Sequence, residues 1–138
     1  MGRHISFAIL LPSLALLLAA CSSSGAPSTS LKVTTTDFTF SPNTFTVPAG
    51  QKISLSLTNN GAVAHSFIIM KAGVEIKSHF EDADPSGIYW QQAPVPPGNS
   101  INAEFTAPSE PGDYQIVCGV HGHFEAGMVA KLIVVAQP

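Results

Sequence analysis

The chain has 138 residues, enough for one well-packed domain and too few for two. Hydrophobic residues make up 45% of it and charged residues only 11%, which excludes a largely disordered chain. The formal net charge of −3 provides no basic stripe, so we expect no nucleic-acid partner.

The N-terminus has the pattern of a targeting segment. Residues 1–20 begin with Arg3 and His4 and continue as an apolar run without an acidic residue. This run is too short and too poorly flanked for a membrane span. It ends in Leu18-Ala-Ala-Cys21, which resembles the lipobox of bacterial lipoproteins. The resemblance implies a signal peptide over 1–20, cleavage before Cys21 and lipid attachment to that cysteine; an ordinary secretory signal is the alternative.

Acylation of Cys21 would leave Cys118 as the only thiol of the mature chain. A lone thiol in an oxidising compartment is a liability unless it is buried or holds a metal. Residues 21–30 are mostly small and polar, which predicts a flexible tether before a domain over 31–138. We therefore expect a lipid-anchored domain in the bacterial cell envelope that faces the periplasm or the cell exterior. The choice between inner and outer membrane stays open.

Short segments rich in β-branched and aromatic residues predict about seven strands and no long amphipathic helix. Residues 71–99 contain many Gly and Pro residues and predict an irregular excursion with one helical turn near 77–82. The fold class expected is all-β, a Greek-key β-sandwich of about seven to eight strands. An immunoglobulin-type sandwich is the structural alternative, but the chain lacks its second core cysteine. The expected strands are Leu31–Phe40, Thr44–Val47, Gln51–Thr58, Ala64–Met70, Ser100–Thr106, Tyr114–Cys118 and Met128–Val135.

The stretch from Cys118 to Met128 gathers three kinds of metal ligand within one loop. It holds a thiol, the imidazoles of His121 and His123, and a thioether. Strands are predicted on both sides, so a rigid scaffold can aim these side chains at one point. Two histidines, one cysteine and a weak axial methionine form the ligand set of a blue-copper electron-transfer site. The stretch therefore predicts a copper site whose remaining histidine comes from upstream.

His65 begins a predicted strand far upstream of Cys118, so the two meet only if the fold brings them together. The pattern of His65 and the segment Tyr114–Met128 resembles the cupredoxins, small blue-copper proteins of the plastocyanin and azurin type. It is most similar to a sulfocyanin-like branch, whose loops run Cys-Gly-x-x-Gly-His followed by Ala-Gly-Met. The resemblance covers most of 31–135. It implies one type 1 copper ion with His65, Cys118 and His123 as equatorial ligands and Met128 as the axial ligand.

The resemblance also favours His123 over His121 as the second histidine ligand. The spacing His-x4-Met recurs in cupredoxins, and only His123 has it relative to Met128. A proline occupies the place of His121 in the similar loops, so we expect His121 at the rim of the site. Ser66 stands where many cupredoxins have asparagine after the first histidine, which leaves the hydrogen bonding beside the thiolate open.

The resemblance implies a membrane-tethered protein that shuttles single electrons between redox partners such as a cytochrome or an oxidase. We expect a monomer and no enzymatic reaction. His121-Gly-His123 also resembles the His-x-His pairs of multicopper oxidases, but those enzymes need several pairs and the chain has five histidines in all.

A periplasmic copper-handling module, a chaperone or a resistance protein, is the functional alternative. Methionine-rich runs are typical of such proteins, and the mature chain keeps only Met70 and Met128.

His79 and the nearby acidic residues suggest a second metal site, although a solvated acidic loop is the favoured interpretation. Those acidic residues are Glu81, Asp82 and Asp84.

Overall fold

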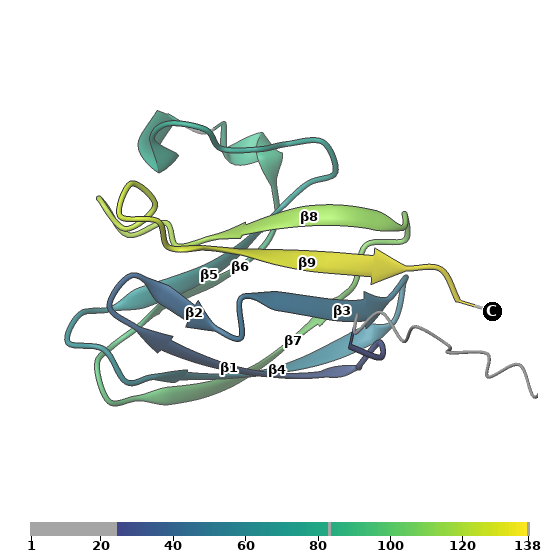
Figure 1. Cartoon of the computed structure of the whole chain (residues 1–138), viewed down its shortest axis with the longest axis horizontal. Helices are drawn as coiled ribbons and strands as arrows, with labels where there is room; N and C mark the ends of the chain where they lie inside the picture. The colour runs from purple at the N-terminus through teal and green to yellow at the C-terminus, as the bar shows by residue number, and fades with distance from the viewer. Residues whose placement is uncertain (1–24, 83, 138) are drawn as a thin grey trace, which may run out of the picture.

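The computed structural model describes residues 25–82 and 84–137, which form nine strands in two sheets packed face to face (Figure 1). The first sheet has the strand order β2-β1-β4-β7 and contains β1 (Ser30–Thr36), β2 (Thr39–Ser41), β4 (Lys52–Asn59) and β7 (Ser100–Thr106). The second has the order β3-β9-β8-β5-β6 and contains β3 (Thr44–Pro48), β5 (His65–Met70), β6 (Ile88–Val95), β8 (Gly112–Val117) and β9 (Val129–Val135). The all-β sandwich is therefore confirmed.

The core lies between the two sheets and follows the alternation of the strands. In β4, Ile53, Leu55 and Leu57 are buried, while the residues between them lie on the outer face. Phe67 and Ile69 of β5 face them from the other sheet in the same cluster. Full burial of one such side chain contributes about 1.5–3 kcal/mol to the free energy of folding, so this inner layer supplies the main stabilisation of the scaffold.

Strand β5 is buried along its whole length. Its outer face forms a second cluster, in which Ile68, Met70 and Val117 are buried. Half-buried residues of the excursion, Val74, Ile76 and Phe80, cover this cluster together with Phe124 of the loop before β9. Met70 is therefore a core residue, as expected, and the excursion packs over the two central strands that carry His65 and Cys118.

The predicted strand Leu31–Phe40 is wrong in one respect, because the chain turns within it. Phe38 has a left-handed φ of +67°, and β1 pairs with β2 as an antiparallel hairpin across this turn. Most of the residues around the turn have high β propensity, which hid the break in the sequence pattern. The turn places Asp37 and Phe38 at the same end of the sandwich as the start of β5.

The expectation that all of 71–99 is irregular is also wrong. Ile88–Val95 forms β6, the edge strand beside β5, and Pro94 is tolerated because an edge strand has one unpaired side. The excursion therefore covers only residues 71–87, and it contains two short 3₁₀ turns, η1 (Phe80–Asp82) and η2 (Pro85–Gly87). The first coincides with the end of the predicted helical turn at 77–82.

The predicted signal peptide and the acylation of Cys21 lie outside the described residues. Within the described ranges, none of the helical segments has the length and apolar character that a membrane crossing requires.

Candidate metal centre

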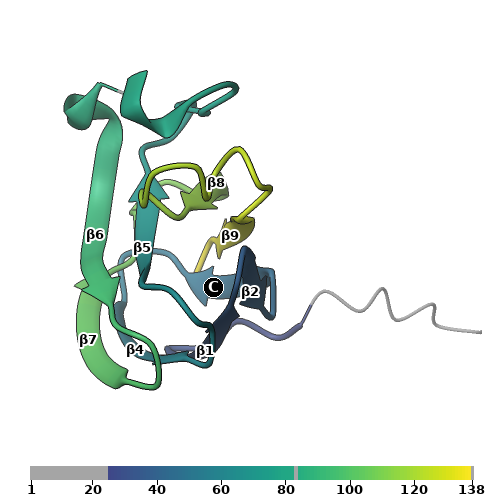
Figure 2. The same cartoon turned by 90° about the vertical axis from the view of Figure 1, so that its left-hand side faces the viewer.

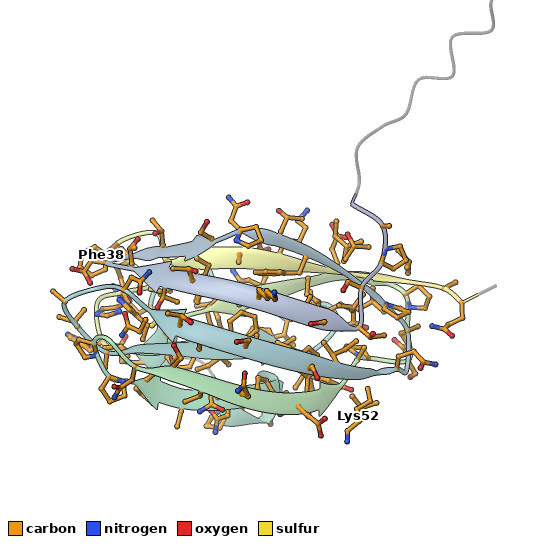
Figure 3. All side chains as sticks on the ribbon, turned by 90° about the horizontal axis from the view of Figure 1, so that it is seen from below. Phe38 and Lys52 are labelled. Carbon is orange, nitrogen blue, oxygen red and sulfur yellow. The ribbon has the colours of Figure 1, made fainter. Side chains whose placement is uncertain are left out.

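Two segments meet at one end of the sandwich and bring the predicted ligands together. His65 is the first residue of β5, and Cys118 directly follows β8. His123 and Met128 come from the ligand loop, residues 118–128, which connects β8 to β9. Figure 3 labels Phe38, which packs against His123 at this end, and Lys52 at the opposite end.

The donor atoms of three predicted ligands converge. Nδ1 of His65 lies 3.1 Å from Nδ1 of His123, and Sγ of Cys118 lies 3.4 Å from the same His123 atom. All three donor atoms lie within 4.8 Å of one another. His65 and Cys118 are completely buried, and His123 is 6% exposed. Two imidazole nitrogens and a sulfur at this spacing fit a single soft or borderline metal ion, and copper has this ligand preference.

Met128 is fully buried and its backbone is fixed beside the other ligands. Its N–H donates to the carbonyl of His123 at 3.0 Å, and its own carbonyl accepts from the N–H of Cys118 at 3.2 Å. The ligand loop closes further on itself, because the N–H of His123 donates to the carbonyl of Val120 at 3.0 Å. Gly122 takes a φ of +77°, a conformation that glycine adopts without strain. The loop is therefore held by its own backbone.

Ser66 ties the cysteine strand to the histidine strand. Its backbone N–H lies 3.4 Å and its hydroxyl oxygen 3.7 Å from Sγ of Cys118, and both groups donate toward the sulfur. The hydroxyl oxygen in turn accepts from the N–H of Gly119 at 2.8 Å. Two donors from Ser66 are therefore directed at the sulfur that would bind a metal, and they fix its position. Ser66 therefore provides hydrogen bonds beside the sulfur at the position where many cupredoxins have asparagine.

The turn between β1 and β2 touches both histidines, a contact that the sequence pattern did not predict. Nε2 of His65 lies 3.3 Å from Oδ1 of Asp37, and the same oxygen accepts from the N–H of Ala62 at 2.9 Å. Phe38 meets the ring of His123 edge-on, with centroids 5.1 Å apart. A Cβ at Gly61 would clash with Oδ1 of Asp37 and lie only 2.8 Å from Nε2 of His65, so a larger residue there would disturb the contact between these two side chains. The signal in the sequence was an aspartate, a residue depleted in strands, inside a β-rich run.

Local electrostatics leaves one histidine neutral and the aspartate charged. Burial lowers the pKa of His123, and the neighbouring His65 lowers it further. The N–H of Ala62 lowers the pKa of Asp37, with a smaller contribution from the hydrogen bond to His65. Because a metal binds the neutral imidazole, the lowered pKa of His123 keeps its nitrogen available as a ligand at neutral pH.

His121 does not join the cluster. Its side chain is 92% exposed, and its Nδ1 lies 2.5 Å from a carboxylate oxygen of Glu81 in the excursion. The structure therefore brings together His65, Cys118 and His123, with the Met128 backbone bonded beside them. It leaves the side chain of His121 outside this group, in solvent.

The sequence from residue 8 to residue 134 matches the family model of the cupredoxin-like domain. The chain belongs to the cupredoxin-like domain family. Auracyanin-A of Chloroflexus aurantiacus is 31% identical to this cupredoxin over 112 residues, which are 71% of this chain and 68% of that protein. The copper-resistant cuproprotein CopI of Rubrivivax gelatinosus is 29% identical over 104 residues, which are 69% of this chain and 59% of CopI. This cupredoxin therefore spans less than two thirds of CopI.

Among solved structures, reduced auracyanin from the photosynthetic bacterium Roseiflexus castenholzii superimposes with a TM-score of 0.68 and 27% identity. The match covers 80% of this cupredoxin and 99% of that chain. Family membership and the ligand set agree with the predicted cofactor, one copper ion. The finer likeness to a sulfocyanin-like branch stays a prediction.

Proposed function

We propose that this cupredoxin carries single electrons and holds a type 1 copper ion through His65, Cys118, His123 and Met128. The observation that supports this most is the convergence of two Nδ1 atoms and one sulfur within 4.8 Å in a buried site. When bound, copper supplies the one-electron redox couple. The similarity to auracyanin-A, a protein described as a "blue" copper protein, points the same way.

The protein's own residues make the site rigid and dry. Ser66 fixes the sulfur from β5, the backbone of the ligand loop fixes His123, and the Asp37–Phe38 turn closes over both histidines. A site that cannot rearrange changes little between two oxidation states, so electron transfer is not slowed by reorganisation. Exclusion of water by the buried surroundings also tunes the reduction potential.

An electron reaches the site through the small exposed part of His123. Phe38 and Val63, each 41% exposed, lie on this end of the molecule and give a partner an apolar surface. We propose a redox protein, a cytochrome or an oxidase, as that partner. Burial of apolar area at such a surface brings a partner close to the ring edge without strong charge pairing.

The position of the N-terminus supports a membrane tether. Residues 25–29 enter at the end of the sandwich opposite the metal site, where the N–H of Ser28 donates to the carbonyl of Thr46 at 2.9 Å (Figure 1). A lipid on Cys21 would therefore attach on the side away from the site, which leaves the site accessible to soluble or neighbouring partners. We propose the periplasm or the exterior of a bacterial cell as the location.

Copper handling is the second candidate function, and the similarity to the copper-resistant cuproprotein CopI supports it. The two functions differ in the oxidation state that the site holds. An electron carrier binds Cu(II) and Cu(I) in turn, whereas a handling protein needs only to bind and release one form.

The visible spectrum of the copper-loaded chain distinguishes them. We expect an intense thiolate-to-copper band with Cu(II), its reversible loss on reduction, and no band in Cys118→Ser. A colourless protein that binds only Cu(I) would contradict electron transfer and favour copper handling.

A further inference from the structure

A second group of metal-binding side chains lies on the surface, outside the copper site. His79 and Glu81 come from the excursion, and Glu125 comes from the ligand loop. Their ligand atoms lie within 4.8 Å of one another. The sequence pattern around His79 favoured a solvated acidic loop because it showed only neighbours along the chain. The fold adds Glu125, which lies far away in sequence.

Two contacts join the excursion to the ligand loop at this point. Nδ1 of His79 lies 3.1 Å from Oε1 of Glu125, and Nδ1 of His121 lies 2.5 Å from Oε1 of Glu81. Each segment therefore contributes one imidazole and one carboxylate. Figure 2 shows the excursion standing directly beside the ligand loop at the end of the sandwich.

Isolated surface pairs account poorly for this arrangement. An exposed ion pair contributes only about 0–1 kcal/mol to stability, so two such pairs give little reason for these four side chains to gather. The carboxylates of Glu81 and Glu125 bring two negative charges into a small volume, which a divalent cation balances. Imidazole and carboxylate together are ligands that Zn²⁺ and Cu²⁺ accept, whereas Mg²⁺ and Ca²⁺ prefer oxygen alone.

We propose that His79, Glu81 and Glu125 form a second, outer site for a divalent transition-metal ion such as Zn²⁺ or Cu²⁺. His121 completes this site by holding Glu81 in place through their contact. The ion links the excursion to the loop that carries His123. None of these four side chains belongs to the inner site, so the outer site does not depend on the proposed electron transfer.

Zinc is the probe that tests this site. The full-length chain is first loaded with one copper ion and is then titrated with Zn²⁺ in a calorimeter, while the visible band reports that the inner site keeps its copper. We expect one Zn²⁺ per chain. His79→Ala and Glu125→Gln should each weaken zinc binding at least tenfold and leave the visible band unchanged.

Glu104→Gln is the matched control, because Glu104 is an exposed carboxylate that pairs with Lys52 on the opposite part of the molecule. It should bind zinc like the unaltered chain. Absence of bound zinc, equal binding by His79→Ala, or an equal loss in Glu104→Gln would overturn the outer site. If no visible band forms, the same titration in a Cys118→Ser background tests the outer site separately from the inner one.

Amide hydrogen exchange provides a second measurement, because an ion that joins the excursion to the ligand loop should restrict the motion of both segments. Zn²⁺ should slow exchange in residues 71–87 of the unaltered chain and leave it unchanged in His79→Ala. Equal exchange with and without zinc in the unaltered chain would show that no ion joins the two segments.

Discussion

Two histidines separated by a single glycine have opposite surroundings, and this difference decides which one is proposed as a ligand. His123 is held by a backbone bond to Val120 and by the ring of Phe38, with its Nδ1 3.4 Å from the sulfur of Cys118. His121 points into solvent and contacts Glu81. The family spacing to Met128 had favoured His123, and the position of the two side chains agrees with it.

The first prediction separates the two histidines. His123→Ala should abolish the visible thiolate-to-copper band, because it removes one of three converging donors, whereas His121→Ala should keep the band. Visible and electron paramagnetic resonance spectra of the two copper-loaded variants measure this. Loss of the band in His121→Ala with retention in His123→Ala would reverse the assignment.

Asp37 leads to a prediction about the reduction potential. Its carboxylate lies 3.3 Å from Nε2 of His65, on the side of the ring away from the metal site, and stabilises positive charge on the ring and the metal that the ring would bind. Asp37→Asn removes the negative charge and keeps a hydrogen-bond acceptor, so the reduced form gains relative stability. The potential should rise by roughly tens of millivolts, where about 59 mV corresponds to a tenfold change for one electron.

Asp113→Asn is the control for this measurement, because Asp113 is an exposed carboxylate that pairs with Lys131 away from the site. Redox titration of both variants by the visible band should show a shift only for Asp37→Asn. A potential that stays constant or falls in Asp37→Asn would contradict a role for this carboxylate.

At the scale of the element, strand β8 and the turn before it position Cys118. Tyr114 of β8 is only 3% exposed, and its hydroxyl donates to the carbonyl of Glu110 in the turn at 2.7 Å. Burial raises the pKa of this phenol. The neutral form is therefore favoured in the folded protein.

Removal of this hydroxyl should destabilise the fold. Tyr114→Phe should lower the free energy of unfolding by about 0.5–1.5 kcal/mol, measured by urea denaturation of the metal-free chain at neutral pH. Tyr89→Phe is the control, since Tyr89 is 38% exposed and its similar bond to the carbonyl of Thr106 lies in solvent. Equal losses in both variants would show that burial of Tyr114 does not matter.

The raised pKa of Tyr114 also determines how the free energy of unfolding changes with pH. Because its pKa is raised in the fold, the unfolded chain loses the phenol proton first, near pH 10. The contribution of Tyr114 to stability should be complete below that pH and should fall above it. Tyr114→Phe should therefore lose less stability than the unaltered chain as the pH rises past about 10.

The elements themselves were mostly predictable, with two exceptions that have physical reasons. Alternating apolar residues identified β4, and turn residues marked its ends. The edge strand β6 was missed because its burial pattern is weak and Pro94 interrupts it. The break between β1 and β2 was missed because Phe38 adopts a positive φ, which a sequence pattern does not show for a bulky residue.

At the scale of the whole molecule, the pairing of β5 with β8 creates the site. Ile68 lies opposite Val117 in this pair, which sets His65 and Cys118 at the same end of the sheet. Local periodicity cannot give such a long-range pairing, so the sequence suggested it only through the family resemblance. The outer contacts of His79 with Glu125 were beyond reach for the same reason.

The whole-molecule arrangement also gives a prediction about anchoring. With the metal site and residues 25–29 at opposite ends, a lipid on Cys21 suits a protein that faces outward from a membrane. The full chain expressed in a bacterial host should fractionate with membranes, and Cys21→Ser should shift it to the soluble fraction. Equal distribution of the two chains would exclude the lipid anchor and leave the sandwich unaffected.

X-ray absorption at the copper edge tests the central claim most directly, because it counts the atoms bound to the metal. The copper-loaded chain should show two nitrogen neighbours and one short sulfur neighbour, and Cys118→Ser should lose the sulfur. A copper ion surrounded only by nitrogen and oxygen in the unaltered chain would contradict the site formed by His65, Cys118 and His123.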